Sequence, residues 1–115
     1  MKTYQSTINN NRIMLNSKTR LNVPISVVIM LKGQANYTIF VLNDGSEKVV
    51  AYTLKYFEPF LKTHGFQRIH RATMINPTFI KKYDDDVNIV TMKNDMAVKV
   101  SRRKRDAFLE KTTFN

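Results

Sequence analysis

A hairpin signal in the middle of the chain constrains the fold more than any other feature. Asn43-Asp44-Gly45 separates two runs rich in β-branched and aromatic residues, 37–42 and 48–52. Glycine tolerates the positive φ of a tight turn, and such runs on both sides of it favour paired strands. The preceding run, residues 25–31, is rich in β-branched residues and predicts a buried strand that Gly33 ends.

Further strands are expected where short apolar runs lie between polar turns. These runs are residues 12–15, 79–83, 87–92 and 96–100. In the last of them, apolar side chains alternate with Ala97 and Lys99, as they do in a strand with one buried face. Strands joined by short turns therefore dominate the predicted structure.

Two helices are expected as well. Thr53 can cap a helix whose apolar face is formed by Leu54, Phe57 and Leu61. Pro59 lies inside this helix and should keep it short or kinked, and Gly65 is placed to end it. Ser101 is placed to cap a second helix that runs to about Lys111. The predicted fold class is mainly β, with one short central helix and a C-terminal helix.

A chain of 115 residues has the length of one domain. We expect residues 1–24 to form an N-terminal segment that is partly flexible and contains the first strand, and residues 25–112 to form the domain proper. Residues 1–11 are polar, so we expect them to be loosely attached, and they lack the apolar centre of a signal peptide. The apolar run 27–31 is too short to cross a membrane, so a cytoplasmic protein is expected.

Positive charge is spread over the whole chain. The formal net charge is +10, from 19 Lys and Arg against 9 Asp and Glu. Residues 1–65 hold 8 basic and 3 acidic groups, and residues 66–115 hold 11 and 6, so each part contributes +5. Distributed positive charge on a small domain favours a nucleic-acid partner. A surface kept soluble by lysine is an equally good explanation of composition alone.

Residues able to carry out chemistry are scarce. Without cysteine there is no disulfide, thiolate metal site or cysteine nucleophile. His64 and His70 lack zinc-site spacing. Asp84–Asp86 is expected to be a solvated turn, because the Gly and distal Glu of a calcium loop are missing. No Gly-rich phosphate loop or nucleophile elbow is present. We therefore expect no enzyme, no metal site and no cofactor.

The segment 66–76 mixes apolar anchors with polar groups. The anchors are Phe66, Ile69, Met74 and Ile75, and the polar groups are Gln67, Arg68, His70 and Arg71. A scaffolded loop that presents polar groups to a partner uses both kinds. Pro77 is expected to mark the end of this segment. For His70, a buried and hydrogen-bonded role in the scaffold is an equal alternative.

A second basic run lies at the start of the predicted C-terminal helix. It contains Lys99, Arg102, Arg103, Lys104 and Arg105, and no acidic residue. Cations in the first helical turn oppose the helix macrodipole, so a surface arranged for stability would carry acids there. The run therefore favours a helix N-terminus that binds phosphate, and a solvated charge run is the alternative.

Several motifs occur in the order and spacing of one known family. They are Asn36-Tyr37-Thr38, Thr53-Leu54-Lys55 with Phe57 and Glu58, Phe66-x-Arg68-Ile69-His70-Arg71, Ile75-Asn76, Ile80, and Val100-Ser101-Arg102-Arg103. Over residues 25–110 the chain resembles the LytTR DNA-binding domain, the output domain of bacterial response regulators, here without a receiver domain. The resemblance implies an elongated stack of small antiparallel sheets. It also implies a transcriptional regulator whose loops enter successive major grooves of double-stranded DNA.

The resemblance also implies roles for particular residues. Asn36 and Arg102 are expected to reach base edges, and Arg71 is expected to grip phosphate. The full set of predicted DNA-binding residues is Asn36, Arg68, His70, Arg71, Arg102, Arg103, Lys104 and Arg105. A homodimer on repeated sites and a partner regulator are further expectations. The chain departs from the family pattern at Lys32, Ala72 and Asp95, where the family usually has an acidic residue, Ser and Gly.

Two other functions stay open on the sequence alone. The first is a single-stranded nucleic-acid binder of the OB type, which needs exposed aromatic residues on one sheet face. Tyr37, Phe40 and Tyr52 are the aromatic residues that could supply such a face. The second is a protein-interaction module that regulates another transcription factor and binds no nucleic acid.

Overall fold

Three antiparallel sheets and two helices make up the computed structural model, which describes residues 2–112. The strands are β1 (Arg12–Asn16), β2 (Leu21–Pro24), β3 (Val28–Gln34), β4 (Tyr37–Leu42), β5 (Glu47–Val50), β6 (Gln67–His70), β7 (Thr73–Ile75), β8 (Ile80–Asp84), β9 (Ile89–Met92) and β10 (Ala97–Lys99). The helices are α1 (Leu54–Lys62) and α2 (Arg102–Lys111), and 3-10 turns occupy Ile25–Val27 and Pro77–Phe79. The mainly β fold class is confirmed.

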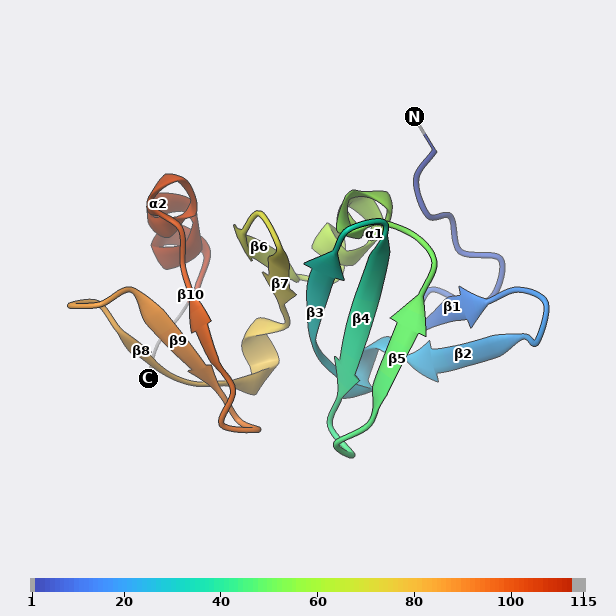
Figure 1. Cartoon of the computed structure of the whole chain (residues 1–115), viewed down its shortest axis with the longest axis horizontal. Helices are drawn as coiled ribbons and strands as arrows, with labels where there is room; N and C mark the ends of the chain where they lie inside the picture. The colour runs from blue at the N-terminus through green and yellow to red at the C-terminus, as the bar shows by residue number, and fades with distance from the viewer. Residues whose placement is uncertain (1, 113–115) are drawn as a thin grey trace.

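The sheets follow one another along the long axis of the molecule (Figure 1). A two-stranded sheet (β1-β2) lies at one end, a five-stranded sheet (β5-β4-β3-β7-β6) in the middle, and a three-stranded sheet (β10-β9-β8) at the other end. The overall extents are 45 × 31 × 24 Å, which confirms the elongated stack of small sheets. None of the helices within residues 2–112 is long and apolar enough to span a membrane.

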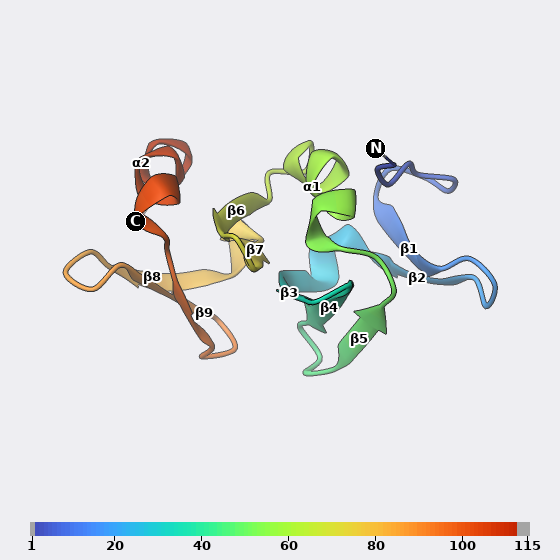
Figure 2. The same ribbon diagram turned by 45° about the horizontal axis from the view of Figure 1, so that its top comes forward.

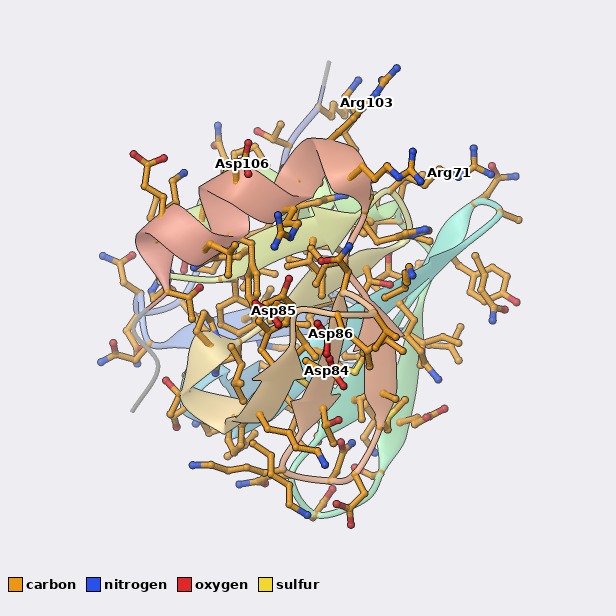
Figure 3. All side chains as sticks on the ribbon, turned by 90° about the vertical axis from the view of Figure 1, so that its left-hand side faces the viewer. Arg71, Asp84, Asp85, Asp86, Arg103 and Asp106 are labelled. Carbon is orange, nitrogen blue, oxygen red and sulfur yellow. The ribbon has the colours of Figure 1, made fainter. Side chains whose placement is uncertain are left out.

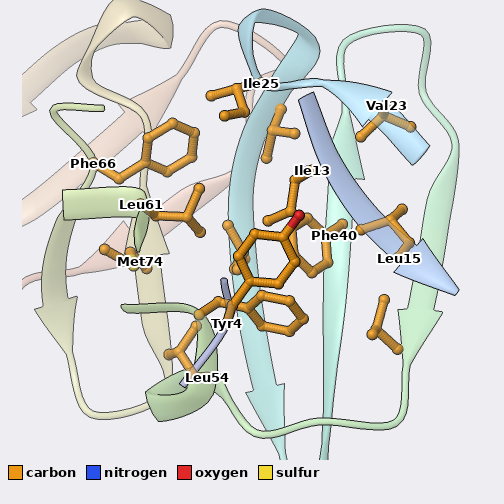
Figure 4. Close-up of a cluster of buried hydrophobic side chains, with 14 of the residues drawn as sticks. Tyr4, Ile13, Leu15, Val23, Ile25, Phe40, Leu54, Leu61, Phe66 and Met74 are labelled. Carbon is orange, nitrogen blue, oxygen red and sulfur yellow. The ribbon is translucent and has the colours of Figure 1, made fainter. Parts of the chain in front are cut away.

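The central sheet is buried on both faces because its strands are apolar at consecutive positions. Side chains alternate between the faces, so Leu31 and Phe40 enter one hydrophobic core while Met30 and Ile39 enter another. The N-terminal core (Figure 4) consists of Tyr4, Ile13, Leu15, Val23, Ile25, Val28, Leu31, Phe40, Leu42, Val50, Leu54, Phe57, Leu61, Phe66 and Met74. The C-terminal core consists of Ile29, Met30, Ile39, Val41, Ile69, Ile75, Val90, Met92, Val98, Val100 and Phe108.

The hairpin predicted around Asn43-Asp44-Gly45 is confirmed, because it joins β4 to β5 and Gly45 has a φ of 89°. The strand before it differs from the prediction at both ends. It begins at Val28, since residues 25–27 form a 3-10 turn, and it continues through Gly33 instead of ending there. A Cβ atom on Gly33 would lie 3.4 Å from the Cβ of Leu54, so glycine lets the start of α1 pack closely on β3.

The N-terminal residues are held more firmly than expected. Tyr4 is buried in the N-terminal core, its backbone N–H donates to the carbonyl of Tyr56 at 2.8 Å, and its hydroxyl accepts from Met14 N at 2.9 Å. The prediction that residues 1–11 are loosely attached is therefore wrong at Tyr4. The division of the chain at residue 25 stays a prediction, although β1 and β2 bury side chains in the same core as β3 and α1.

Both helices begin where the sequence predicts. Thr53 and Ser101 are the N-cap residues, although neither side chain makes a capping hydrogen bond to the described residues. Pro59 is accommodated within α1, and Gly65 follows the helix with a φ of 84°. The three apolar positions predicted for the buried face of α1 are all buried.

The acidic run Asp84–Asp86 begins in the C-terminal sheet, where β8 ends at Asp84. Asp84 Oδ1 accepts a hydrogen bond from the backbone N–H of Asp86 at 3.0 Å in an exposed turn.

Candidate nucleic-acid interface

Three turns carry predicted contact residues to one edge of the molecule. Asn36 lies in the two-residue turn between β3 and β4, Arg71 lies in the turn between β6 and β7, and Arg102 begins α2. All three sites lie at the upper side of the ribbon in Figure 1, and Figure 2 turns this side toward the viewer. We call this surface, formed by residues 35–36, 71–72 and 102–104, the cationic edge.

The middle turn of the cationic edge belongs to a β-hairpin. The segment 66–76 was expected to be a loop, and this expectation is wrong, because β6 and β7 pair antiparallel at the border of the central sheet. Its apolar anchors point to the two faces of the sheet, as side chains of strands do. Phe66 and Met74 enter the N-terminal core, and Ile69 and Ile75 enter the C-terminal core. The hairpin is thus fixed by both cores, and Arg71 stands at its tip.

Two open grooves connect the three turns. The first, of about 370 Å³, lies between the β3–β4 turn and the β6–β7 turn and is lined by Ala35, Lys55 and Arg71 among others. The second, of about 510 Å³, is lined by His70, Arg71, Ser101, Arg102, Arg103 and Lys104. Arg71 borders both grooves, and among the described residues no acid lines either one. The cationic edge is therefore a continuous surface.

The N-terminus of α2 is held against the β6–β7 hairpin. The backbone N–H of Ser101 donates to the carbonyl of Ile69 at 2.8 Å, and Phe108 is buried in the C-terminal core. The first turn of α2, all of it described, contains no acidic residue. The positive end of the helix macrodipole therefore adds to the charges of Arg102 and Arg103 at this end of the cationic edge.

Four of the eight side chains predicted to bind DNA are open to solvent. Asn36, Arg71, Arg102 and Arg103 are all exposed. In Figure 3, Arg71 and Arg103 project at the same side of the molecule, whereas Asp84–Asp86 lie over the C-terminal sheet away from them. The acidic run therefore does not neutralise the cationic edge.

Arg68 is placed differently from the other predicted contact residues. Its Nη1 lies 2.7 Å from Glu58 Oε1, its Nε donates to the carbonyl of His70 at 3.4 Å, and its Nη2 donates to the carbonyl of Arg71. The side chain is only 18% exposed. Arg68 thus lies beneath the β6–β7 turn and uses its donors within the protein.

His70 also supports the turn. It is half-buried, and its Nδ1 accepts a hydrogen bond from the backbone N–H of Ala72 at 3.1 Å. Asn76, at the end of the same hairpin, is buried, and its Nδ2 donates to the carbonyl of Val28 at 3.0 Å. Both residues therefore make hydrogen bonds that stabilise the scaffold of the hairpin.

Lys104 and Arg105, the last two cations of the basic run, point to different parts of the surface. Lys104 borders the second groove and also a cleft between α1 and α2. Arg105 turns toward β8, where its Nε donates to the hydroxyl of Tyr83 at 3.4 Å. This hydrogen bond is the main reason that the pKa of Arg105 is raised. Arg105 therefore lies away from the grooves of the cationic edge.

Lys55 lies beside the cationic edge, and it is not among the DNA-binding residues predicted from the sequence. It is exposed in the first turn of α1 and lines the first groove together with Arg71. The signal was present, because Lys55 belongs to the Thr53-Leu54-Lys55 motif. Only the packing of α1 beside β3 and β7 shows that this lysine lies between two of the contact turns.

Glu58 gives a prediction about the pH dependence of stability. Burial, the largest single influence, raises its pKa, but hydrogen bonds from Lys62 and Arg68 and their charges outweigh it and hold the pKa below its ordinary value of 4.5. A carboxylate with a lowered pKa stabilises the fold above its ordinary pKa, and this contribution is lost as the pH falls through the folded pKa. We expect Glu58→Gln to cost about 0.2–1 kcal/mol at neutral pH. In urea unfolding the difference from the unsubstituted protein should shrink below pH 4.5; a pH-independent difference would contradict this.

Comparisons with known proteins agree with the fold and identify the family. The family model described as the LytTr DNA-binding domain matches residues 18–113. Among solved structures, a LytTr DNA-binding domain from Bacillus cereus is similar with a TM-score of 0.75 and 26% sequence identity. The similarity covers 90% of this chain and 98% of that chain. No curated protein matches the chain.

Proposed function

The chain belongs to the LytTR family of DNA-binding domains, and from this premise we propose that it is a transcriptional regulator that binds double-stranded DNA sequence-specifically. The observation that carries the proposal is the cationic edge. Three turns far apart in sequence bring Asn36, Arg71 and Arg102 to one exposed side, and the grooves between them have no acidic lining within residues 2–112. Such a surface can neutralise phosphates and leave a few side chains free to reach bases.

The proposed roles follow from side-chain chemistry. Arg102 reads a guanine through two parallel hydrogen bonds, and Asn36 bonds an adenine edge. Arg71, Arg103 and Lys104 bind phosphates, and Lys55 adds a phosphate contact between the two hairpin turns. Arg71 borders both grooves and so lies between the β3–β4 turn and the start of α2, and we propose that these two ends of the edge enter successive major grooves.

The proposal includes a setting for this activity. The protein acts in the bacterial cytoplasm as a binding module without catalysis. Because one domain of this size covers a short site, two copies bind repeated sites side by side. A partner regulator that acts through the same domain is an additional proposal, and it would use surface outside the cationic edge.

The single-stranded alternative has weaker support in the structure. Phe40 is buried in the N-terminal core, and Tyr37 is half-buried with its hydroxyl donating to Gln34 Oε1 at 2.8 Å. Tyr52 is half exposed, but its ring stacks on Tyr56 at a centroid distance of 4.1 Å. These three rings do not form an open stacking face for bases.

Selection of bound duplexes from a random pool, read at two salt concentrations, tests the proposal. We expect a short motif to be enriched and the logarithm of the affinity to fall with the logarithm of salt with a slope of about −3 to −4, from about four phosphate contacts. A single-stranded oligonucleotide of the same sequence should compete poorly. A pool without enrichment, or equal competition by single strands, would reject sequence-specific duplex binding. If the protein binds an acidic protein and does not bind duplex DNA, the alternative of a protein-interaction module is favoured.

A further inference from the structure

We propose that Glu58, an acidic residue, raises the affinity for DNA by positioning Arg71 through Arg68. This inference rests on the proposed function, and it changes the role expected of Arg68 from a DNA contact to a positioning residue. The predicted effect is the opposite of the one expected from charge alone, because removing a negative charge from the protein should weaken its binding to DNA, a polyanion.

The contacts around the β6–β7 turn carry the inference. The guanidinium of Arg68 donates to the carbonyls of His70 and Arg71, which are two of the turn's backbone acceptors. The imidazole of His70 accepts from the N–H of Ala72. Two side chains from β6 therefore bind three consecutive residues of the turn, and Arg71 is the middle one. A turn held at three points keeps the exposed Arg71 side chain on one side of the hairpin.

Glu58 fixes the guanidinium that makes two of these bonds. Its Oε1 lies 2.7 Å from Arg68 Nη1, and its Oε2 lies 2.9 Å from Lys62 Nζ. The Glu58 side chain is 16% exposed, so the pair is partly shielded from water. Charge-assisted hydrogen bonds are roughly twice as strong as neutral ones. The carboxylate therefore restricts Arg68 to the orientation in which its other donors meet the turn.

Glu58 itself stands on a rigid support. Phe57 next to it is 1% exposed, and Leu61 one turn later is fully buried, so α1 is anchored in the N-terminal core. The chain of contacts thus runs from the core through Glu58 and Arg68 to the backbone of Arg71. Without this link, the turn that carries Arg71 would have to be ordered when DNA binds, at a cost similar to the roughly 0.5–1.5 kcal/mol for immobilising one flexible side chain.

The sign of the effect separates positioning from simple electrostatics. Glu58→Gln keeps the shape of the side chain and raises the net charge by one, so long-range attraction to DNA alone would leave the affinity equal or higher. Positioning predicts that Glu58→Gln weakens binding to the selected duplex by about twofold to tenfold at neutral pH. The slope against salt should be unchanged, because the number of phosphates contacted is the same.

Asp95→Asn is the matched control. Asp95 also pairs with a lysine, its Oδ1 lying 2.8 Å from Lys81 Nζ, and it lies in the β9–β10 turn, at the lower side of Figure 1. This substitution makes the same change of charge and chemistry, and asparagine tolerates the positive φ of 68° at this position. We expect Asp95→Asn to leave the affinity equal or slightly higher.

A double-mutant cycle with Arg71→Ala tests the route of the effect. If Glu58 acts through Arg71, Glu58→Gln should cost little further affinity in the Arg71→Ala background. Hydrogen exchange at the amides of Arg71 and Ala72 should be faster in Glu58→Gln than in Asp95→Asn. Thermal unfolding of each variant, followed by circular dichroism, gives the folded fraction at the binding temperature and corrects the affinities for any loss of fold.

The outcomes separate this inference from the function on which it rests. If the unsubstituted protein fails to select or retain duplex DNA, the proposed function itself is wrong. If it binds and Arg71→Ala weakens binding, but Glu58→Gln binds as tightly as Asp95→Asn, the positioning role alone is overturned. A full effect of Glu58→Gln that persists in the Arg71→Ala background would overturn it too.

Discussion

Replacing Arg102 with Ala should weaken binding to the selected duplex by about 1–3 kcal/mol and relax the preference at one base pair. Arg102 is exposed at the first position of α2, where the absence of an acid in the described first turn leaves its guanidinium unopposed. The backbone bond from Ser101 to Ile69 fixes this end of the helix beside the β6–β7 hairpin. Because the backbone at Arg102 is held in place, truncating a side chain that reads a guanine from there would remove two base hydrogen bonds at once.

Lys104→Ala provides the contrast within the same helix turn. A lysine that binds phosphate has no sequence preference, so its loss should weaken all duplexes alike and reduce the salt slope by about 0.9. Lys93→Ala removes the same charge from the exposed β9–β10 turn, away from the cationic edge, and should change little. Fluorescence anisotropy titrations on the selected duplex and on duplexes with single base-pair changes measure all three effects. Equal, sequence-independent losses for Arg102→Ala and Lys104→Ala would show that Arg102 does not read a base.

Much of the fold could be predicted because local chemistry decides it. Asn43-Asp44-Gly45 marked its hairpin, Ser101 marked the start of α2, and the run of β-branched residues in β3 predicted a buried strand. The sequence also predicts DNA-contact residues in the three turns that form the cationic edge. Their convergence on one edge depends on the pairing of β3 with both β4 and β7, which no local pattern contains.

Some residues have surroundings that the sequence does not indicate, because a side chain's partner is set by tertiary packing. Arg68 looks like a DNA contact in sequence, and only the position of Glu58, ten residues earlier on α1, shows where its guanidinium is held. Gly33 looks like a strand breaker, but it serves the close approach of Leu54. Tyr4 lies in a polar stretch, and a single buried aromatic there gives no periodic signal.

One departure from the family pattern has a simple explanation in backbone geometry. Asp95, where the family usually has glycine, has a φ of 68°. Asp tolerates the left-handed region better than most residues. Its carboxylate also pairs with Lys81, so an aspartate with a favourable contact occupies this left-handed position in place of glycine.

Replacing Phe108 with Ala should destabilise the protein by about 3–5 kcal/mol, because it empties the largest side-chain site of α2 in the C-terminal core. Phe108 is 1% exposed, and its ring meets that of Tyr83 edge to face at a centroid distance of 5.4 Å. It is the one fully buried residue of α2, all of which lies in the described part of the chain. A total stability of about 5–15 kcal/mol is usual for such a domain, so this loss is a large fraction of it.

Leu109→Ala is the matched control for Phe108→Ala. Leu109 is only partly buried against the same core, so its truncation removes less buried surface and should cost about 1 kcal/mol. Urea unfolding measures both losses, and hydrogen exchange in α2 shows whether the helix detaches before the rest unfolds. Because α2 has so little other apolar attachment, Phe108→Ala should expose its amides first and lower DNA affinity even at temperatures where the N-terminal core stays folded. Equal protection of α2 in the two variants, with equal DNA affinity, would mean that the backbone bond at Ser101 alone is enough to hold the arginines on the cationic edge.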